Sequence, residues 1–142
     1  MITCKATREG LVGKRTSTGW LINTTTPFVA LPSTAALRQW IRLFNPANGN
    51  TCRALVLDVG PWNVDDDAYV FQPLTLDKLG LPLVVGASSR FMGGVRPLAE
   101  KGIDLSQNNH TNFAGIDLGE AVWTALGLPA AGGSADISWE FL

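Results

Sequence analysis

The stretch from Ala114 to Leu128 constrains the fold most, because it joins an apolar stripe to an acid that stands between two apolar residues. Its apolar side chains recur at intervals of three and four residues, the spacing of a short amphipathic helix: Leu118, Ala121, Val122, Ala125 and Leu126. Gly127 stands where a left-handed residue ends a helix, and Pro129 prevents the helix from continuing. The stretch therefore predicts a strand that leads into a short helix.

Asp117 lies at this junction, between Ile116 and Leu118. One interpretation is an acid at the start of the helix, where the helix dipole stabilises negative charge. The other is a functional carboxylate held in a partly dry groove. The local sequence favours the first interpretation and leaves the second open.

The rest of the chain predicts a mainly β fold, because 15 glycines and 8 prolines interrupt it too often for a helical bundle. Its 142 residues correspond to a single domain, residues 1–142, that can bury its own core. An Asn48-Gly49 pair predicts a hairpin turn. We expect strands at 2–7, 28–31, 39–44, 51–58 and 135–141, a short extended segment at 20–24, and a helical turn at 33–37.

Side-chain alternation predicts which residues face the core. In the strand that ends at Asp58, alternation puts Asp58 on the same face as Ala54 and Val56. Three tryptophans lie on patterned elements, and we expect them in the core: Trp40, Trp123 and Trp139.

Charge and segment length exclude several classes of partner. The net charge of −1 gives no electrostatic basis for binding nucleic acid or an anionic membrane. No apolar run approaches the ~20 residues of a membrane-spanning helix. The N-terminus does not resemble a secretory signal, so we expect a leader removed earlier, another route of export, or residence inside the cell.

The sequence predicts neither a metal site nor a cofactor. Cys4 and Cys52 are far apart and favour two buried free thiols over a disulfide, and a single His110 makes a zinc site unexpected. The acidic run 65–67 predicts a solvated loop tip, because it lacks the glycine and distal glutamate of a calcium loop. The segment 13–16 does not have the spacing of a phosphate-binding loop.

Five short motifs follow one another along the chain: Gly13–Gly19, Ala30–Pro32, Asn45–Asn50, Val56–Trp62, and Gly115–Leu118 with its helix. Together they resemble the motifs of the double-psi β-barrel of the rare lipoprotein A type. The resemblance covers residues 1–62 and 114–141. It implies a six-stranded double-psi β-barrel with one or two short helices and a long insertion at about residues 63–113.

The sequence departs from the family pattern at several positions. The insertion separates two aspartate motifs that a short loop usually joins, Val59 stands where arginine is usual, and Gly119 replaces the usual serine. Asp104 lies in a near copy of the second motif, Ile-Asp-Leu-Ser. We prefer Asp117 as the motif aspartate, because only Asp117 leads into the amphipathic helix.

Barrels of this type include lytic transglycosylases, expansins and small endoglucanases. The resemblance implies action on peptidoglycan or a related polysaccharide and a protein directed to the cell wall. It implies Asp117 as the catalytic acid, Asp58 as the second catalytic aspartate, and four residues that bind substrate: Thr7, Thr16, Trp62 and Trp20. The tryptophans would stack on sugar rings, although core packing is the alternative for each.

The chemistry of glycosidic bond cleavage agrees with two carboxyl groups. A protonated acid must reach the leaving oxygen, and an oxocarbenium-like centre must be stabilised. A nearby Asp58 would raise the pKa of Asp117 and keep it protonated at neutral pH. In the lytic reaction the 6-hydroxyl of the sugar attacks, so no second carboxylate has to activate water.

Two other functions remain open from the sequence. The barrel could be a non-hydrolytic, expansin-like module that binds polysaccharide. It could instead be an inert part of a phage or secretion assembly, in which the insertion forms the contact surface of a homo-oligomer or a larger complex.

Overall fold

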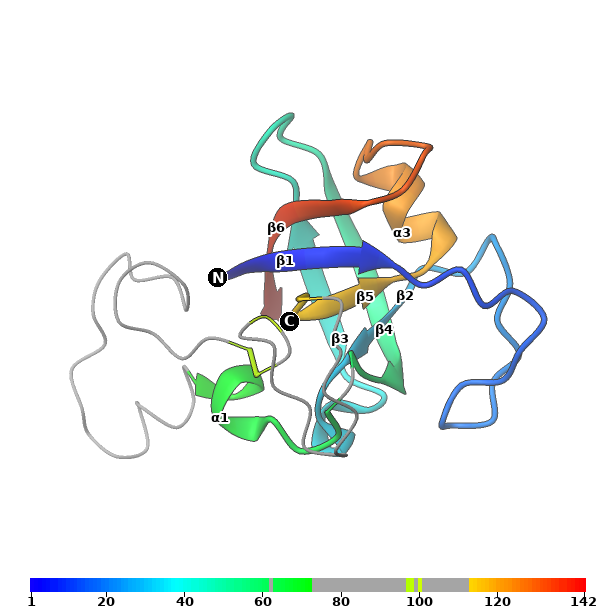
Figure 1. Ribbon diagram of the computed structural model, residues 1–142, viewed down its shortest axis with the longest axis vertical. Coiled ribbons are helices and arrows are strands. Elements are labelled where there is room, and N and C mark those ends of the chain that lie inside the picture. The colour runs from blue at the N-terminus through cyan, green and yellow to red at the C-terminus, as the bar shows by residue number, and fades with distance from the viewer. Residues whose placement is uncertain (62, 73–96, 99, 101–112) are drawn as a thin grey trace.

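The computed structural model describes residues 1–61, 63–72, 97, 98, 100 and 113–142 (Figure 1). The strands of this part are β1 (Ile2–Arg8), β2 (Phe28–Leu31), β3 (Trp40–Phe44), β4 (Thr51–Val59), β5 (Ile116–Leu118) and β6 (Ser134–Phe141). The helices are α1 (Asp67–Val70), α3 (Glu120–Ala125) and a 3-10 turn, Thr34–Ala36. This confirms the mainly β fold with two short helices, and the strand at 116–118 leads into α3 as predicted.

The strands close into a mixed barrel in the order β1-β5-β2-β4-β3-β6. The β1–β5 and β2–β4 pairs are parallel, and the other pairs are antiparallel. This arrangement is compatible with a double-psi barrel. None of the described helices is long and apolar enough to cross a membrane.

Alternate side chains of each strand fill the barrel. In β1 the buried residues are Ile2, Cys4 and Ala6, and the residues between them face outward. The hydroxyl oxygen of Tyr69, on α1, lies 3.0 Å from the carbonyl oxygen of Gly115 and accepts a 3.0 Å hydrogen bond from the indole N–H of Trp139. These buried contacts fix α1 against the barrel, on the side away from the β1–β2 loop, residues 9–27 (Figure 1).

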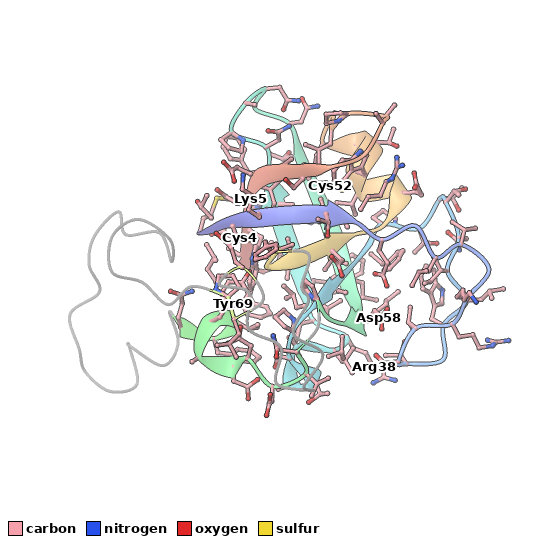
Figure 2. The ribbon with its side chains drawn as sticks, viewed as in Figure 1. Cys4, Lys5, Arg38, Cys52, Asp58 and Tyr69 are labelled. Atoms are coloured by element: carbon pink, nitrogen blue, oxygen red, sulfur yellow. The ribbon has the colours of Figure 1, made fainter. Side chains whose placement is uncertain are left out.

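The predictions for cysteine and tryptophan hold in part. Both cysteines are free; Cys4 is fully buried beside Tyr69, whereas Cys52 is only partly buried (Figure 2). Trp123 and Trp139 lie in the core as predicted. The prediction for Trp40 was wrong: its side chain is 53% exposed, because Ile41 and Leu43 take the inward positions of β3.

The prediction of a solvated loop tip at 65–67 was wrong for its central residue. Asp66 is only 5% exposed, and its carboxylate accepts a 2.8 Å hydrogen bond from the backbone N–H of Leu98. Asp67 accepts a 2.5 Å hydrogen bond from the hydroxyl of Ser33. The acidic run thus joins the start of α1 to the barrel. The segment 20–24 forms no strand and has one isolated bridge, between Arg15 and Leu21.

Candidate functional site

Four adjacent strands carry a single row of paired residues on the outer face of the barrel. Thr7 of β1 pairs with Asp117 of β5, Asp117 pairs with Ala30 of β2, and Ala30 pairs with Asp58 of β4. We call these residues the acid row. Because paired residues project to the same face and neighbouring strands lie about 4.8 Å apart, the backbones of Asp58 and Asp117 are about 10 Å apart. Only the methyl group of Ala30 stands between them in the row.

A register shift brings Asp58 into the acid row. Val29 pairs with Val56, but the next residue, Ala30, pairs with Asp58, so that Leu57 is the extra residue of a β-bulge. Val29 and Val56 belong to the core, and Ala30 does not. The sequence prediction that Asp58 shares the face of Val56 was therefore wrong, because alternation assumes an unbroken strand.

Asp117 is held by the strand beside it. The hydroxyl of Thr7 donates a 2.5 Å hydrogen bond to Oδ1 of Asp117, and both side chains are half-buried. The structure thus brings together three of the predicted site residues, Thr7, Asp58 and Asp117. The alternative motif aspartate, Asp104, lies outside the described residues.

The β1–β2 loop packs over the end of β4 that carries Asp58. The backbone N–H of Ser17 donates to Oδ1 of Asp58 at 3.0 Å, and the N–H of Val59 donates to the same oxygen at 2.9 Å. The hydroxyl of Thr18 donates to the carbonyl of Leu57 at 2.9 Å. Figure 2 shows Asp58 on the side of the barrel that carries this loop. The loop therefore fixes one oxygen of the Asp58 carboxylate.

The other predicted substrate-binding residues do not belong to the acid row. Thr16 is buried, and its hydroxyl lies 2.8 Å from that of Thr18, so it supports the loop. Trp20 is half-buried and packs edge-on against Phe28, with ring centroids 4.9 Å apart. Trp62 lies outside the described residues.

Glu9 is a member of the site that the sequence analysis missed. Glu9 follows β1 directly, its backbone N–H donates to the carbonyl of Leu118 at 2.8 Å, and its side chain is only 9% exposed. Burial, then a hydrogen bond with Asp58, then the negative charges of Asp58 and Asp117 raise the pKa of Glu9 to about 9. Period-two alternation from Thr7 would have indicated Glu9, because it places both side chains on one side.

Asp58 and Glu9 form a hydrogen-bonded pair in which their pKa values shift in opposite directions. Burial raises the pKa of Asp58, but hydrogen bonds from Glu9, from the N–H groups of Ser17 and Val59 and from the Ser17 hydroxyl outweigh it, so this pKa lies below its ordinary value. Oε2 of Glu9 is buried and has no hydrogen-bond partner among the described residues. A neutral Glu9 that donates to an ionised Asp58 accounts for these observations together. Of this pair, Glu9 is thus the member that keeps its proton at neutral pH.

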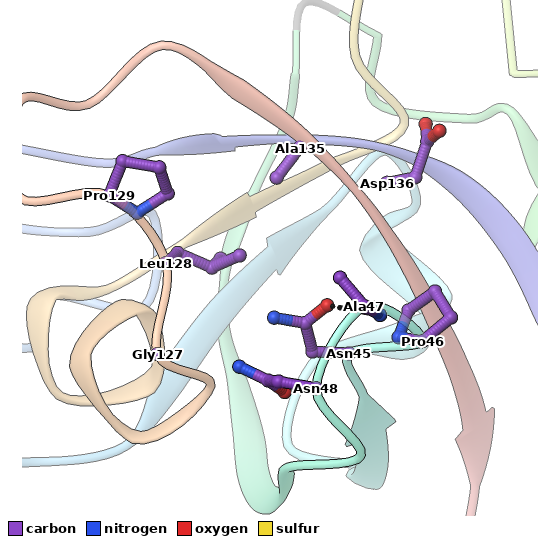
Figure 3. Close-up of a pocket in the computed structure, with 9 residues that line it drawn as sticks. All are labelled: Asn45, Pro46, Ala47, Asn48, Gly127, Leu128, Pro129, Ala135 and Asp136. Atoms are coloured by element: carbon purple, nitrogen blue, oxygen red, sulfur yellow. Dashed lines mark hydrogen bonds between the residues drawn. The ribbon is translucent and has the colours of Figure 1, made fainter.

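The acid row contains no metal-ligating cluster, and a cleft of the described residues lies away from it. Within the described ranges, no group of three or more His, Cys, Asp or Glu side chains is arranged to hold a metal ion. A cleft of about 640 Å³ lies between the β3–β4 hairpin and the turn after α3 (Figure 3). Two of its amides, from Asn45 and Asn48, already donate to the carbonyl of Leu126 at 2.8 and 3.0 Å. These amides therefore cap the C-terminal end of α3.

A family model described as a domain of unknown function (DUF8814) matches residues 1–137. The match includes every residue of the acid row and Glu9. No curated protein sequence matches the chain.

Proposed function

The chain belongs to the DUF8814 family, and we propose that this barrel binds a cell-wall polysaccharide, peptidoglycan or a related glycan, and cleaves its glycosidic bonds. The observation that carries the proposal is the acid row: two carboxyl groups on one face, separated by a methyl group and joined to a third, buried carboxyl. Glycosidic bond cleavage requires a proton donor and a negative charge near the anomeric carbon, and carboxyl groups supply both.

In this proposal Asp117 is the acid that protonates the leaving oxygen. The Thr7 hydroxyl orients the Asp117 carboxyl by its 2.5 Å hydrogen bond. As the bond between the anomeric carbon and the leaving oxygen breaks, positive charge develops on the sugar ring, and the ionised Asp58 stabilises it. The 6-hydroxyl of the same sugar then attacks the anomeric carbon and gives its proton to the Asp117 carboxylate, which restores the acid.

Purified cell-wall sacculi test the proposal. The sacculi are incubated with the wild-type protein and with Asp117→Asn, Asp58→Asn and the surface control Glu140→Gln, and the soluble products are identified by mass spectrometry. We expect anhydro-sugar products from the wild type and from the control. Asp117→Asn keeps an oxygen that can accept from Thr7, so it should fold, and it should lower the rate by about 10²-fold or more.

The other outcomes separate the alternative functions. If the protein pellets tightly with sacculi and releases no product, it is a polysaccharide-binding module of the expansin-like kind. If it neither binds nor cleaves and forms a stable oligomer in light scattering, it is an assembly part. Either result contradicts the proposed cleavage.

A further inference from the structure

We infer that Glu9 is a positioning residue of the acid row, which as a neutral acid donates a hydrogen bond to Asp58 and keeps Asp58 as the ionised member of the pair. The role in catalysis rests on the proposed function, whereas the hydrogen bond and the ionisation states belong to the free protein. Neither the family match nor the resemblance to double-psi β-barrels of the rare lipoprotein A type assigns a role to this position.

The position of Glu9 is fixed by the barrel. The residue directly follows β1, and its 2.8 Å backbone hydrogen bond to Leu118 continues the β1–β5 pairing beyond the last strand residue. Two residues after Thr7, its side chain projects to the same side as the acid row. From there it forms its hydrogen bond with Asp58.

The surroundings of Glu9 oppose a negative charge. The ionisable groups of the described residues that act on it are Asp58 from β4 and Asp117 from β5, and both are acids. An ionised Glu9 would be a third carboxylate, more than nine-tenths buried, with Oε2 lacking any donor among the described residues. A proton on Glu9 removes this charge and supplies a donor that Asp58 accepts.

Burial also separates the role of Glu9 from that of a catalytic acid. Its Oε2 atom is buried, so Glu9 does not face substrate and acts through Asp58. Asp58 accepts from Glu9, from Ser17 and from Val59, and these donors all favour its ionised form. Glu9 therefore lowers the pKa of Asp58, so that Asp58 stays ionised and can stabilise positive charge at a lower pH.

Carboxyl-carbon NMR titration of the free protein tests the inference without any glycan. The samples are wild type, Glu9→Gln, Glu9→Met and the control Glu140→Gln. Glutamine keeps a donor toward Asp58, methionine keeps the size without a donor, and neither changes the charge of a neutral Glu9. We expect Glu9 to titrate near pH 9. We expect the midpoint of Asp58 to stay low in Glu9→Gln and to rise by about one pH unit in Glu9→Met.

The inference is overturned if Glu9 titrates near its ordinary value, or if Asp58 has the same midpoint in Glu9→Met as in the wild type. A merely structural Glu9 would give this second result. If Glu9→Met does not fold, the wild-type titration of Glu9 and the Asp58 midpoint in Glu9→Gln decide the question.

Product release from sacculi is then measured against pH. We expect the pH profile of the wild type to steepen near pH 9 as Glu9 ionises. Glu9→Gln should lack this step and keep only the alkaline fall that belongs to the general acid. A step near pH 9 that persists in Glu9→Gln overturns the catalytic part of the inference. If the wild type releases no product while the titrations follow expectation, the proposed function fails and the assignment of Glu9 stands.

Discussion

Thr7 and Asp117 are joined across the parallel β1–β5 pair by a hydrogen bond of 2.5 Å from the Thr7 hydroxyl to Oδ1 of the aspartate. Their backbones are also in register, so the hydroxyl and the carboxylate are placed by the same ladder that closes the barrel. A side-chain contact built on a strand pair restricts the orientation of Asp117 more than a loop contact would.

Thr7→Val removes the hydroxyl and keeps the branched shape. We expect a loss of about 1–2 kcal/mol in the free energy of unfolding, because a half-buried carboxylate loses a donor, and an approximately tenfold slower release of sugar products. Urea unfolding and product release measure the two effects. Thr3→Val is the control, because Thr3 lies on the same strand and bonds to Ser138 at 2.9 Å, away from the acids. Equal loss of product release in both variants would contradict the prediction.

Stability should fall as pH rises, because the pKa of Glu9 is about 9 in the folded protein and 4.5 in the reference state. Between these values the unfolded chain has lost the proton that the native state keeps, so the Glu9 contribution is full below about pH 4.5 and declines up to pH 9. Its slope is at most about 1.4 kcal/mol per pH unit.

Glu9→Gln cannot ionise, so it should gain stability relative to the wild type as pH rises through this window. Denaturant unfolding at several pH values measures the difference. Glu140→Gln, at an exposed ion pair with Arg42, should show no comparable trend. A constant difference between wild type and Glu9→Gln would refute the prediction.

Gly119→Ser should destabilise the protein, although serine is the usual residue of the family that the sequence resembles. A Cβ atom at this position would lie 2.3 Å from Cε1 of Phe28 and 3.0 Å from its carbonyl oxygen. Phe28 is fully buried and cannot move away freely, so we expect a loss of about 1–3 kcal/mol. The control is Gly10→Ser, where a Cβ would meet nothing within 4 Å. Thermal unfolding compares the variants, and equal melting temperatures would contradict the prediction.

Local patterns were sufficient to predict most of the barrel. Ile137 and Trp139 alternate with polar residues, and both are buried in β6 as period-two alternation requires. Gly127 ends α3 with a φ of +66°, where its left-handed conformation was expected. These features depend on neighbours along the chain, which a sequence displays directly.

The site could be predicted only in part, because it depends on contacts between strands. The bulge at Leu57 turns Asp58 out of the core, and nothing in the alternation of β4 indicates it. The burial of Asp66 follows from its contact with Leu98, distant in sequence. The burial of Glu9 depends on its contacts with Asp58 of β4 and Leu118 of β5, both distant in sequence.

The C-terminal end of α3 depends on asparagines of the β3–β4 hairpin, and this dependence gives the last prediction. The amides of Asn45 and Asn48 both donate to the carbonyl of Leu126, and that of Asn50 donates to Ala125 at 3.3 Å. Asn45 is buried, and its own side-chain oxygen accepts from the N–H of Ala47 at 3.0 Å. Its side chain thus supplies a hydrogen-bond donor to the helix end and an acceptor to the turn.

Asn45→Ala should cost about 2 kcal/mol in the free energy of unfolding, because the carbonyl of Leu126 loses one of its two donors, the N–H of Ala47 loses its acceptor, and the buried side chain leaves a cavity. Asn45→Asp keeps the shape and the turn but directs a carboxylate at the carbonyl of Leu126, so it should cost at least as much. The exposed Asn50 supplies the matched comparison, and Asn50→Ala should cost no more than about 0.5 kcal/mol. Hydrogen exchange of the α3 amides, measured beside urea unfolding, should accelerate in the Asn45 variants alone. Because α3 directly follows the strand that holds Asp117, equal protection in all three variants would show that the hairpin does not support this end of the site.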